Sequence, residues 1–184
     1  MASELSTVRP VLLLHQEGVI GLVAVIGLGL RDGDPLGGLA PQGALAWSLA
    51  VGALVGIESS GALWLTRHLP PLAELQRFQQ RLVRGWTAVD AAAVALLSGL
   101  AEEALLRALL QPAIGLYGAA LLFAVLHLVP DRRLWMWPVI ALGLGIVLGL
   151  VFSRYGYPAA ATAHCAINLL ALMRLRRGDS MVVD

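Results

Sequence analysis

Three short polar motifs lie in the apolar second half of this chain, and their residue types are those that hydrolytic sites use. They are Glu102-Glu103-x-x-x-Arg107, Phe123-x-x-x-His127 and His164-x-x-x-Asn168. Each motif falls on a segment that reads as a membrane-spanning helix, where one charged side chain costs about 2.5 to 3.5 kcal/mol on an insertion scale. The two glutamates and the arginine together cost roughly 8 to 10 kcal/mol unless they are paired or face a cavity. Ionisable residues placed at such a cost usually serve a function.

Helical spacing sorts these residues by the partner that each can reach. Adjacent residues on a helix point about 100° apart, whereas residues four apart share a face. Glu103 and Arg107 can therefore form an ion pair, which leaves Glu102 free to face the interior as a general base or acid. His164 and Asn168 share a face in the same way. A carboxylate, two imidazoles and a carboxamide can thus converge from three helices.

Two hydrolytic chemistries suit this set of residues, and a structural interpretation stands beside them. In the first, Glu102 and His127 activate a water molecule for attack on a peptide carbonyl. His164 and Asn168 then stabilise the oxyanion, and no metal is needed. In the second, Glu102, His127 and His164 bind zinc with an open water position, although the usual His-Glu-x-x-His motif is absent. In the structural interpretation, these groups only form hydrogen bonds between helices.

The order of the three motifs on successive apolar helices resembles the CPBP family of intramembrane endopeptidases. That family includes CAAX prenyl proteases, bacteriocin-processing proteins and abortive-infection proteins. The resemblance covers residues 87–173. It implies a glutamate-type intramembrane protease, once classed as a metalloprotease, that cleaves a membrane-associated protein or peptide near the membrane surface. Some members remove the tripeptide that follows a prenylated cysteine.

The resemblance implies catalytic roles for four residues and supporting roles for three. Glu102 corresponds to the catalytic glutamate, and His127 to its partner in water activation. His164 and Asn168 correspond to the oxyanion site. The supporting residues are Glu103, Arg107 and Phe123. No cofactor is expected on this interpretation, and zinc is the alternative.

A second class of function is a non-proteolytic bacteriocin-immunity or abortive-infection membrane protein that binds a partner. Such a protein would tolerate the loss of Glu102, whereas the presence of every motif residue favours the enzyme. A proton-relaying transporter is a third option, but no inverted repeat is evident. Only two spans precede the motif-bearing segments, fewer than in eukaryotic members of the family, so the resemblance does not specify a prenylated substrate.

The composition defines the setting of these motifs. Of the 184 residues, 58% are hydrophobic and 14% are charged, and the mean hydropathy is +0.77. These values are typical of a polytopic membrane protein, so we expect an all-α transmembrane bundle. No polar linker divides the chain, which predicts one domain over residues 1–184 with a four-helix core at 87–173. A net charge of +1 gives no sign of a nucleic-acid partner, and a single cysteine excludes an internal disulfide.

Six apolar runs are long enough to cross a membrane. They cover residues 11–30, 44–66, 87–110, 113–129, 134–152 and 157–173. An amphipathic segment at 72–84 predicts a helix in the interface that contacts anionic lipid, and packing on the bundle is the equal alternative. Glycines four apart, Gly52 with Gly56 and Gly145 with Gly149, favour close helix packing within the bundle over dimerisation.

The arginines predict the orientation of the chain. With the N-terminus inside, ten arginines fall on one face of the membrane and two on the other. Because short cytoplasmic loops carry the basic excess, both termini are expected in the cytoplasm, with the protein in a bacterial cytoplasmic membrane. Its expected partners are the bilayer and a membrane-associated protein or peptide substrate. The oligomeric state is left open.

The predicted topology places Glu102 and His127 at different depths in the membrane. His127 falls near the cytoplasmic end of its span, while Glu102 falls beyond the midpoint of a span that runs outward. Straight helices would separate them, so a tilt, a break around Gly99 or a different helix boundary must bring them together. For Glu58, in the second span, the alternatives are a place on the substrate path and a hydrogen bond across helices, and the hydrogen bond is expected.

Overall fold

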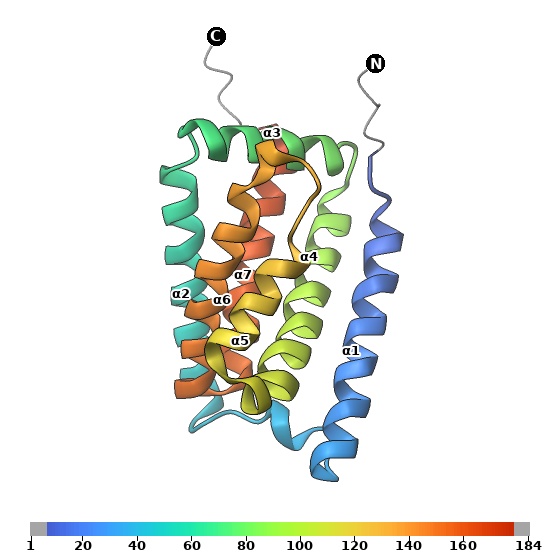
Figure 1. Cartoon of the computed structure of the whole chain (residues 1–184), viewed down its shortest axis with the longest axis vertical. Helices are drawn as coiled ribbons and strands as arrows, with labels where there is room; N and C mark the ends of the chain where they lie inside the picture. The colour runs from blue at the N-terminus through green and yellow to red at the C-terminus, as the bar shows by residue number, and fades with distance from the viewer. Residues whose placement is uncertain (1–6, 179–184) are drawn as a thin grey trace.

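The computed structural model describes residues 7–178, and within that range the chain forms a helical bundle without a β-strand (Figure 1). The elements are α1 (Pro10–Asp32), η1 (Gly37–Leu39), α2 (Leu45–Leu65), α3 (Pro70–Leu82), α4 (Ala88–Glu103), η2 (Ala104–Leu110), α5 (Gln111–Leu126), η3 (Arg132–Leu134), α6 (Met136–Tyr155) and α7 (Tyr157–Arg177). Here η1 and η3 are 3₁₀-helices and η2 is a π-helix. The predicted all-α class is confirmed, and each of the six apolar runs falls on helix.

Four stretches of the described helices are long and apolar enough to cross a membrane. They are Pro10–Asp32, Leu45–Leu65, Ala88–Leu126 and Arg132–Tyr155. The third contains α4, η2 and α5, and Gly115 interrupts it with a left-handed φ of 76°. The chain reverses its direction there, at the lower end of the bundle in Figure 1. The protein is therefore an integral membrane bundle, and the total of six spans remains a prediction.

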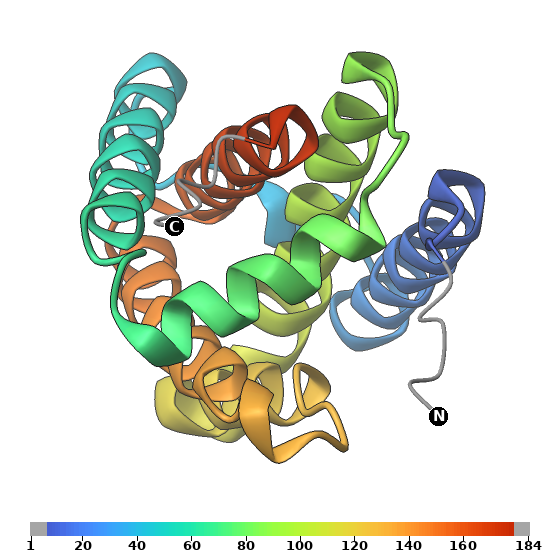
Figure 2. The same ribbon diagram turned by 90° about the horizontal axis from the view of Figure 1, so that it is seen from above.

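Close contacts at glycines hold the bundle around α7, which lies between α2 and α4 (Figure 2). A Cβ atom at Gly56 would lie 2.6 Å from the carbonyl oxygen of Ala163, and one at Gly99 would lie 2.6 Å from the Sγ atom of Cys165. Gly145 approaches the backbone of α5 in the same way, with Ala120 Cα 3.1 Å from its added Cβ. The glycine pairs thus serve packing within the bundle, as their spacing predicts.

The amphipathic segment forms α3, which lies across one end of the bundle (Figures 1 and 2). Leu75 and Phe78 from its apolar face are buried against Leu134 and neighbouring side chains of the bundle. Of the two predicted roles, the structure therefore shows packing on the bundle for this stripe. α1 begins and α7 ends at the same end of the molecule, where α3 also lies. The side of the membrane that this end faces remains a prediction.

Glu58 does not lie between helices, so the expected hydrogen bond across helices is wrong. Its side chain is exposed on the outer face of α2 and forms no hydrogen bond or ion pair with any residue in the range 7–178. Val55 and Ser60 face neighbouring helices instead. The sequence could not distinguish these faces because polar residues occur on both.

Candidate active site

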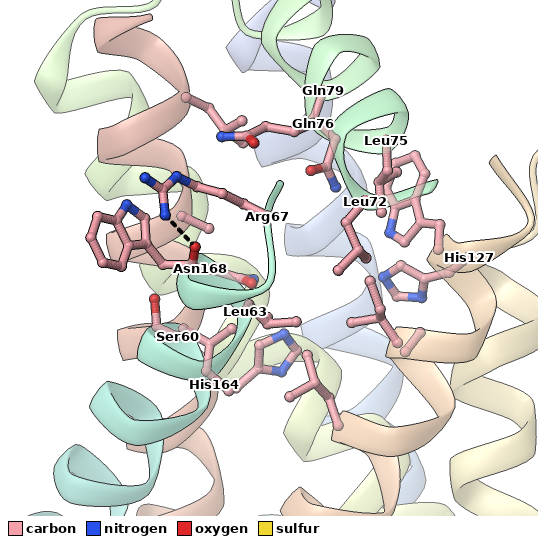
Figure 3. Close-up of a pocket in the computed structure, with 18 of the residues that line it drawn as sticks. Ser60, Leu63, Arg67, Leu72, Leu75, Gln76, Gln79, His127, His164 and Asn168 are labelled. Atoms are coloured by element: carbon pink, nitrogen blue, oxygen red, sulfur yellow. Dashed lines mark hydrogen bonds between the residues drawn. The ribbon is translucent and has the colours of Figure 1, made fainter. Parts of the chain in front are cut away.

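A cavity of about 210 Å³ lies beneath α3 and is lined mainly by α3, α6 and α7, with a smaller contribution from α2. Most of its lining is apolar, but Glu102, His127, His164 and Asn168 all contribute to it. Figure 3 shows His127, which follows α5, and His164 and Asn168 of α7 around the same space. The structure therefore brings together all four residues that the sequence predicts to be catalytic.

The helix that carries the two adjacent glutamates changes its geometry just after them. A capping box fixes its start, because Thr87 Oγ1 accepts from the Asp90 N–H at 3.1 Å and Asp90 Oδ2 accepts from the Thr87 N–H at 2.8 Å. The α-helix ends at Glu103, and η2 continues as a π-helix. π-Turns occur often at functional sites, where they place side chains that a regular helix would misdirect.

Arg31 at the end of α1 supports this π-helix. Its Nη1 atom donates to the carbonyl oxygens of Ala108 and Leu109 at 3.0 and 2.7 Å. Its Nε atom donates to Asp32 at 2.7 Å, so the neighbouring carboxylate holds the guanidinium in place. Arg31 therefore satisfies carbonyl groups near the end of the element that positions Arg107.

Glu103 and Arg107 form the ion pair that their spacing predicts. The Arg107 Nε atom donates to Glu103 Oε2 at 3.1 Å, and both side chains are 0% exposed. The other carboxylate oxygen, Oε1, lies 2.9 Å from His164 Nδ1. A carboxylate only accepts, so Nδ1 carries the proton in this hydrogen bond. Glu103 thus fixes the orientation of the imidazole, and His164 Nε2 is the nitrogen left to face the cavity.

Glu102, unlike the buried Glu103, faces the cavity. Its side chain is 19% exposed and lines the cavity, with Oε2 4.0 Å from His164 Nε2. That separation is beyond a direct hydrogen bond. The two adjacent glutamates therefore lie on two sides of the same imidazole, but only Glu103 forms a hydrogen bond with it. Glu102 is the carboxylate with lone pairs directed at the cavity.

His127 follows the last residue of α5, and both the carbonyl oxygen and the ring of Phe123 contact its imidazole. Its Nδ1 atom lies 2.8 Å from the Phe123 carbonyl oxygen, so Nδ1 donates and Nε2 is left as an acceptor. The Phe123 ring meets the rings of His127 and His164 edge to face, with centroids 4.5 and 5.6 Å apart. The Arg107 guanidinium lies 5.6 Å from the same ring. Phe123 therefore contacts a residue of each motif, which supports its predicted structural role.

The loop after His127 is tied by Asp131. The Arg133 side chain and backbone N–H both donate to this carboxylate, which lowers the pKa of Asp131 to about 2. The carboxylate therefore stays ionised at every physiological pH. It also caps η3, the short turn that leads into α6.

The position of the reversal at Gly115 explains how Glu102 and His127 meet. Glu102 lies 13 residues before Gly115, and His127 lies 12 residues after it. At about 1.5 Å per helical residue, both side chains lie roughly 20 Å from the turn and so at similar depth. The sequence left open a tilt, a break around Gly99 or a different helix boundary. The structure shows a different helix boundary, at Gly115.

Comparison with known proteins identifies this region. A model of the Rce1-like type II CAAX prenyl endopeptidase family matches residues 84–170. Residues 84–170, slightly less than half of the chain, are therefore similar to that family. The matched Rce1-like segment contains all three motifs, in agreement with the resemblance inferred from them, and the family points to a membrane-embedded protease of the CAAX type. No curated protein and no solved structure matches the chain.

Sequence reasoning missed a polar residue inside the Rce1-like segment. Asn168 Nδ2 donates to the Oγ atom of Ser98 at 2.9 Å, and Ser98 is buried on α4 one turn before Glu102. This hydrogen bond fixes the carboxamide plane and leaves one N–H of the same nitrogen for other partners. The spacing of four residues between Ser98 and Glu102 is a signal that could have indicated the contact.

Other cavity residues lie outside the Rce1-like segment. Gln76 and Gln79 of α3 point toward the cavity in Figure 3, and Ser60 Oγ accepts from Arg174 at 3.1 Å. Glu17 of α1 does not line the cavity, but it is buried with Oε2 unpaired among the described residues and interacts electrostatically with Glu102 and His164. No spacing rule links these residues to the motifs, because only the fold of α1 and α3 brings them near.

The three predicted zinc ligands lie around one cavity. Among residues 7–178, no three His, Cys, Asp or Glu side chains form a group that could hold a metal ion. Glu102, His127 and His164 all line the cavity but do not form such a group. The absence of a cofactor therefore stays a prediction, with zinc as its alternative, and the mechanism proposed below uses no metal.

Proposed function

We propose that this protein is an intramembrane endopeptidase of glutamate type that hydrolyses a peptide bond of a membrane-associated protein or peptide. The observation that carries the proposal is that the two adjacent glutamates have different environments. Glu103 is fully buried and bonded to both Arg107 and His164, whereas Glu102 lines the cavity without a hydrogen bond to another described residue. Among the acidic residues of the Rce1-like segment, Glu102 alone lines the cavity.

In the proposed reaction, Glu102 accepts a proton from water while the water oxygen attacks the peptide carbonyl carbon. His127 holds that water through Nε2, which is the acceptor nitrogen because Nδ1 donates to the Phe123 carbonyl. The protonated Glu102 then delivers the proton to the departing amine as the carbon–nitrogen bond breaks. General acid–base catalysis of this kind contributes about 10² to 10⁴ in rate.

His164 and Asn168 stabilise the oxyanion that forms on the carbonyl oxygen. Asn168 donates through the N–H that Ser98 does not use. His164 donates through Nε2 when that nitrogen carries a proton, with Glu103 fixing the ring from the other side. Loss of one such donor typically lowers kcat by about 10²- to 10³-fold.

The test compares the protein termini in cells that express the wild type with those in cells that express Glu102→Gln at matched abundance. Termini that occur with the wild type and disappear in the variant are expected, and they would identify the substrate. Glu74→Gln is the matched control, because Glu74 pairs with Arg77 on α3 and does not line the cavity. Identical termini in the wild type and a folded Glu102→Gln variant would refute proteolysis and favour partner binding.

A further inference from the structure

Glu58 is placed where a carboxylate is costly. It lies 13 residues from the first residue of α2 and 7 from the last, so it is about 5 Å from the middle of that helix along its axis. α2 is long and apolar enough to span the membrane, whose hydrocarbon core is about 30 Å thick. The side chain is exposed, and no hydrogen bond or ion pair joins it to another of the residues 7–178. An intramembrane ionisable side chain of this kind normally has a partner.

The surface around Glu58 has the spacing of a helix-packing seam. Six residues that alternate four and three apart form one stripe on the outer face of α2, and we call this stripe the α2 seam. It consists of Trp47, Val51, Leu54, Glu58, Gly61 and Leu65. Trp47, Leu54 and Leu65 are 62%, 57% and 63% exposed, and a Cβ atom at Gly61 would meet nothing within 4 Å. Two helices can approach closely at such a glycine.

We propose that the α2 seam is a dimer interface in which this chain pairs with a second copy of itself. A protonated carboxyl group is both donor and acceptor, so Glu58 and Glu58 of the partner subunit can satisfy each other across a twofold axis. Lipid tails offer neither donor nor acceptor. A twofold axis along the membrane normal makes the two α2 helices parallel, so that like residues of the seam meet. A heptad seam with one polar position specifies register and oligomeric state in this way.

The interface leaves the proposed active site of each copy intact. Ser60 and Leu63 of α2 line the cavity, while Gly52 and Gly56 pack against α7. These residues lie on other faces of the helix than the α2 seam. Dimerisation and catalysis are therefore separable by mutation.

The test measures dimerisation of the fluorescently labelled full chain by single-molecule photobleaching in phosphatidylcholine–phosphatidylglycerol vesicles over a range of protein-to-lipid ratios. Glu58→Leu removes the hydrogen bonds, and we expect Kd to rise about 3- to 30-fold, which corresponds to about 0.6 to 2 kcal/mol. Glu58→Gln keeps a donor and an acceptor and is expected to dimerise within threefold of the wild type.

Gly61→Leu and Gly18→Leu form the matched pair. Both glycines lie on helices, and a Cβ atom added at either one would meet no other atom of the same copy within 4 Å. Only Gly61 lies in the α2 seam, and we expect Gly61→Leu to weaken the dimer at least tenfold while Gly18→Leu leaves it unchanged. A wild type that is monomeric at every ratio, or a Gly61→Leu variant that dimerises as the wild type does, would overturn the proposal.

Discussion

Removal of the buried carboxylate of Glu103 should destabilise the whole bundle and not only the active site. Glu103 is the single anionic partner of Arg107 among the described residues, and both side chains are 0% exposed. In Glu103→Gln, the Arg107 guanidinium stays buried without a counter-charge. Two of its nitrogens, Nη1 and Nη2, already have no hydrogen-bond partner there, so no second acceptor can take over.

The expected loss follows from the known behaviour of buried ion pairs. Removal of one partner of such a pair costs about 3 to 5 kcal/mol in the free energy of unfolding, because an uncompensated charge remains. For a chain of this size, each kcal/mol lowers Tm by about 2 to 4 °C, so Glu103→Gln should lower Tm by about 6 to 20 °C. The five tryptophans of the chain report thermal unfolding in detergent by their fluorescence.

A second substitution separates this effect from any loss of catalysis. Glu103→Gln with Arg107→Met removes the stranded charge, so most of the lost unfolding free energy should return. Proteolysis should not return, because His164 Nδ1 would then face a carboxamide instead of the carboxylate that accepts its proton at 2.9 Å. A Glu103→Gln variant that loses less than 1 kcal/mol, or a double variant as unstable as the single one, would refute this account of the ion pair.

Three further substitutions test other contacts by the same unfolding measurement. Gly56→Ala should lower the free energy of unfolding by about 1 to 3 kcal/mol, because the new Cβ would lie 2.6 Å from the Ala163 carbonyl oxygen. An unchanged free energy of unfolding would show that α2 and α7 pack less closely. Arg31→Met should cost about 1 to 3 kcal/mol and reduce proteolysis, since two carbonyl groups near the end of the π-helix lose their donor; unchanged stability would remove Arg31 from the support of η2. Glu17→Met should raise the unfolding free energy by about 1 to 3 kcal/mol, because it removes a buried carboxylate oxygen without a partner, and a lower value would show that Glu17 has a stabilising partner.

The helical segments and the ion pair could be predicted because their signals are local. A run of apolar residues of membrane length identifies a helix wherever it packs, and all six runs fall on helix. The spacing of four residues between Glu103 and Arg107 places them on one face, and their contact at 3.1 Å follows. The apolar character of the segments that surround the motifs likewise predicts that these polar groups turn inward.

The reversal between α4 and α5 could not be placed from the same signals. Pro112 indicated a helix boundary, which put the break between residues 110 and 113. In the structure, Pro112 lies in the first turn of α5, where the missing N–H is not needed, and the reversal comes three residues later at Gly115. Because Gly115 adopts a positive φ without steric cost, it sets the depth at which Glu102 meets His127.

The face of a helix that packs on the bundle was equally hard to predict. An apolar stripe on α3 fits a lipid surface as well as it fits the end of a bundle, and only the folded contacts of Leu75 and Phe78 decide between them. Glu58 and Ser60 are two residues apart on α2, yet Ser60 bonds to Arg174 inside the bundle while Glu58 faces outward. Which residue faces inward depends on the rotation of α2 about its axis, and a helix that is apolar on all sides does not encode that rotation strongly.

The adjacent glutamates explain why the first motif needs its arginine. A catalytic imidazole must be held in one orientation, and at membrane depth the holding group is a carboxylate that itself requires a counter-charge. Arg107 supplies that charge to Glu103 within the same helix, so His164 is fixed through Oε1 without any demand on Glu102. Because neighbouring residues on a helix point about 100° apart, Glu102 is directed to the cavity by the same turn that buries Glu103. The ion pair and the reactive carboxylate are therefore one device, and loss of Arg107 should disable the site even though Arg107 does not line the cavity.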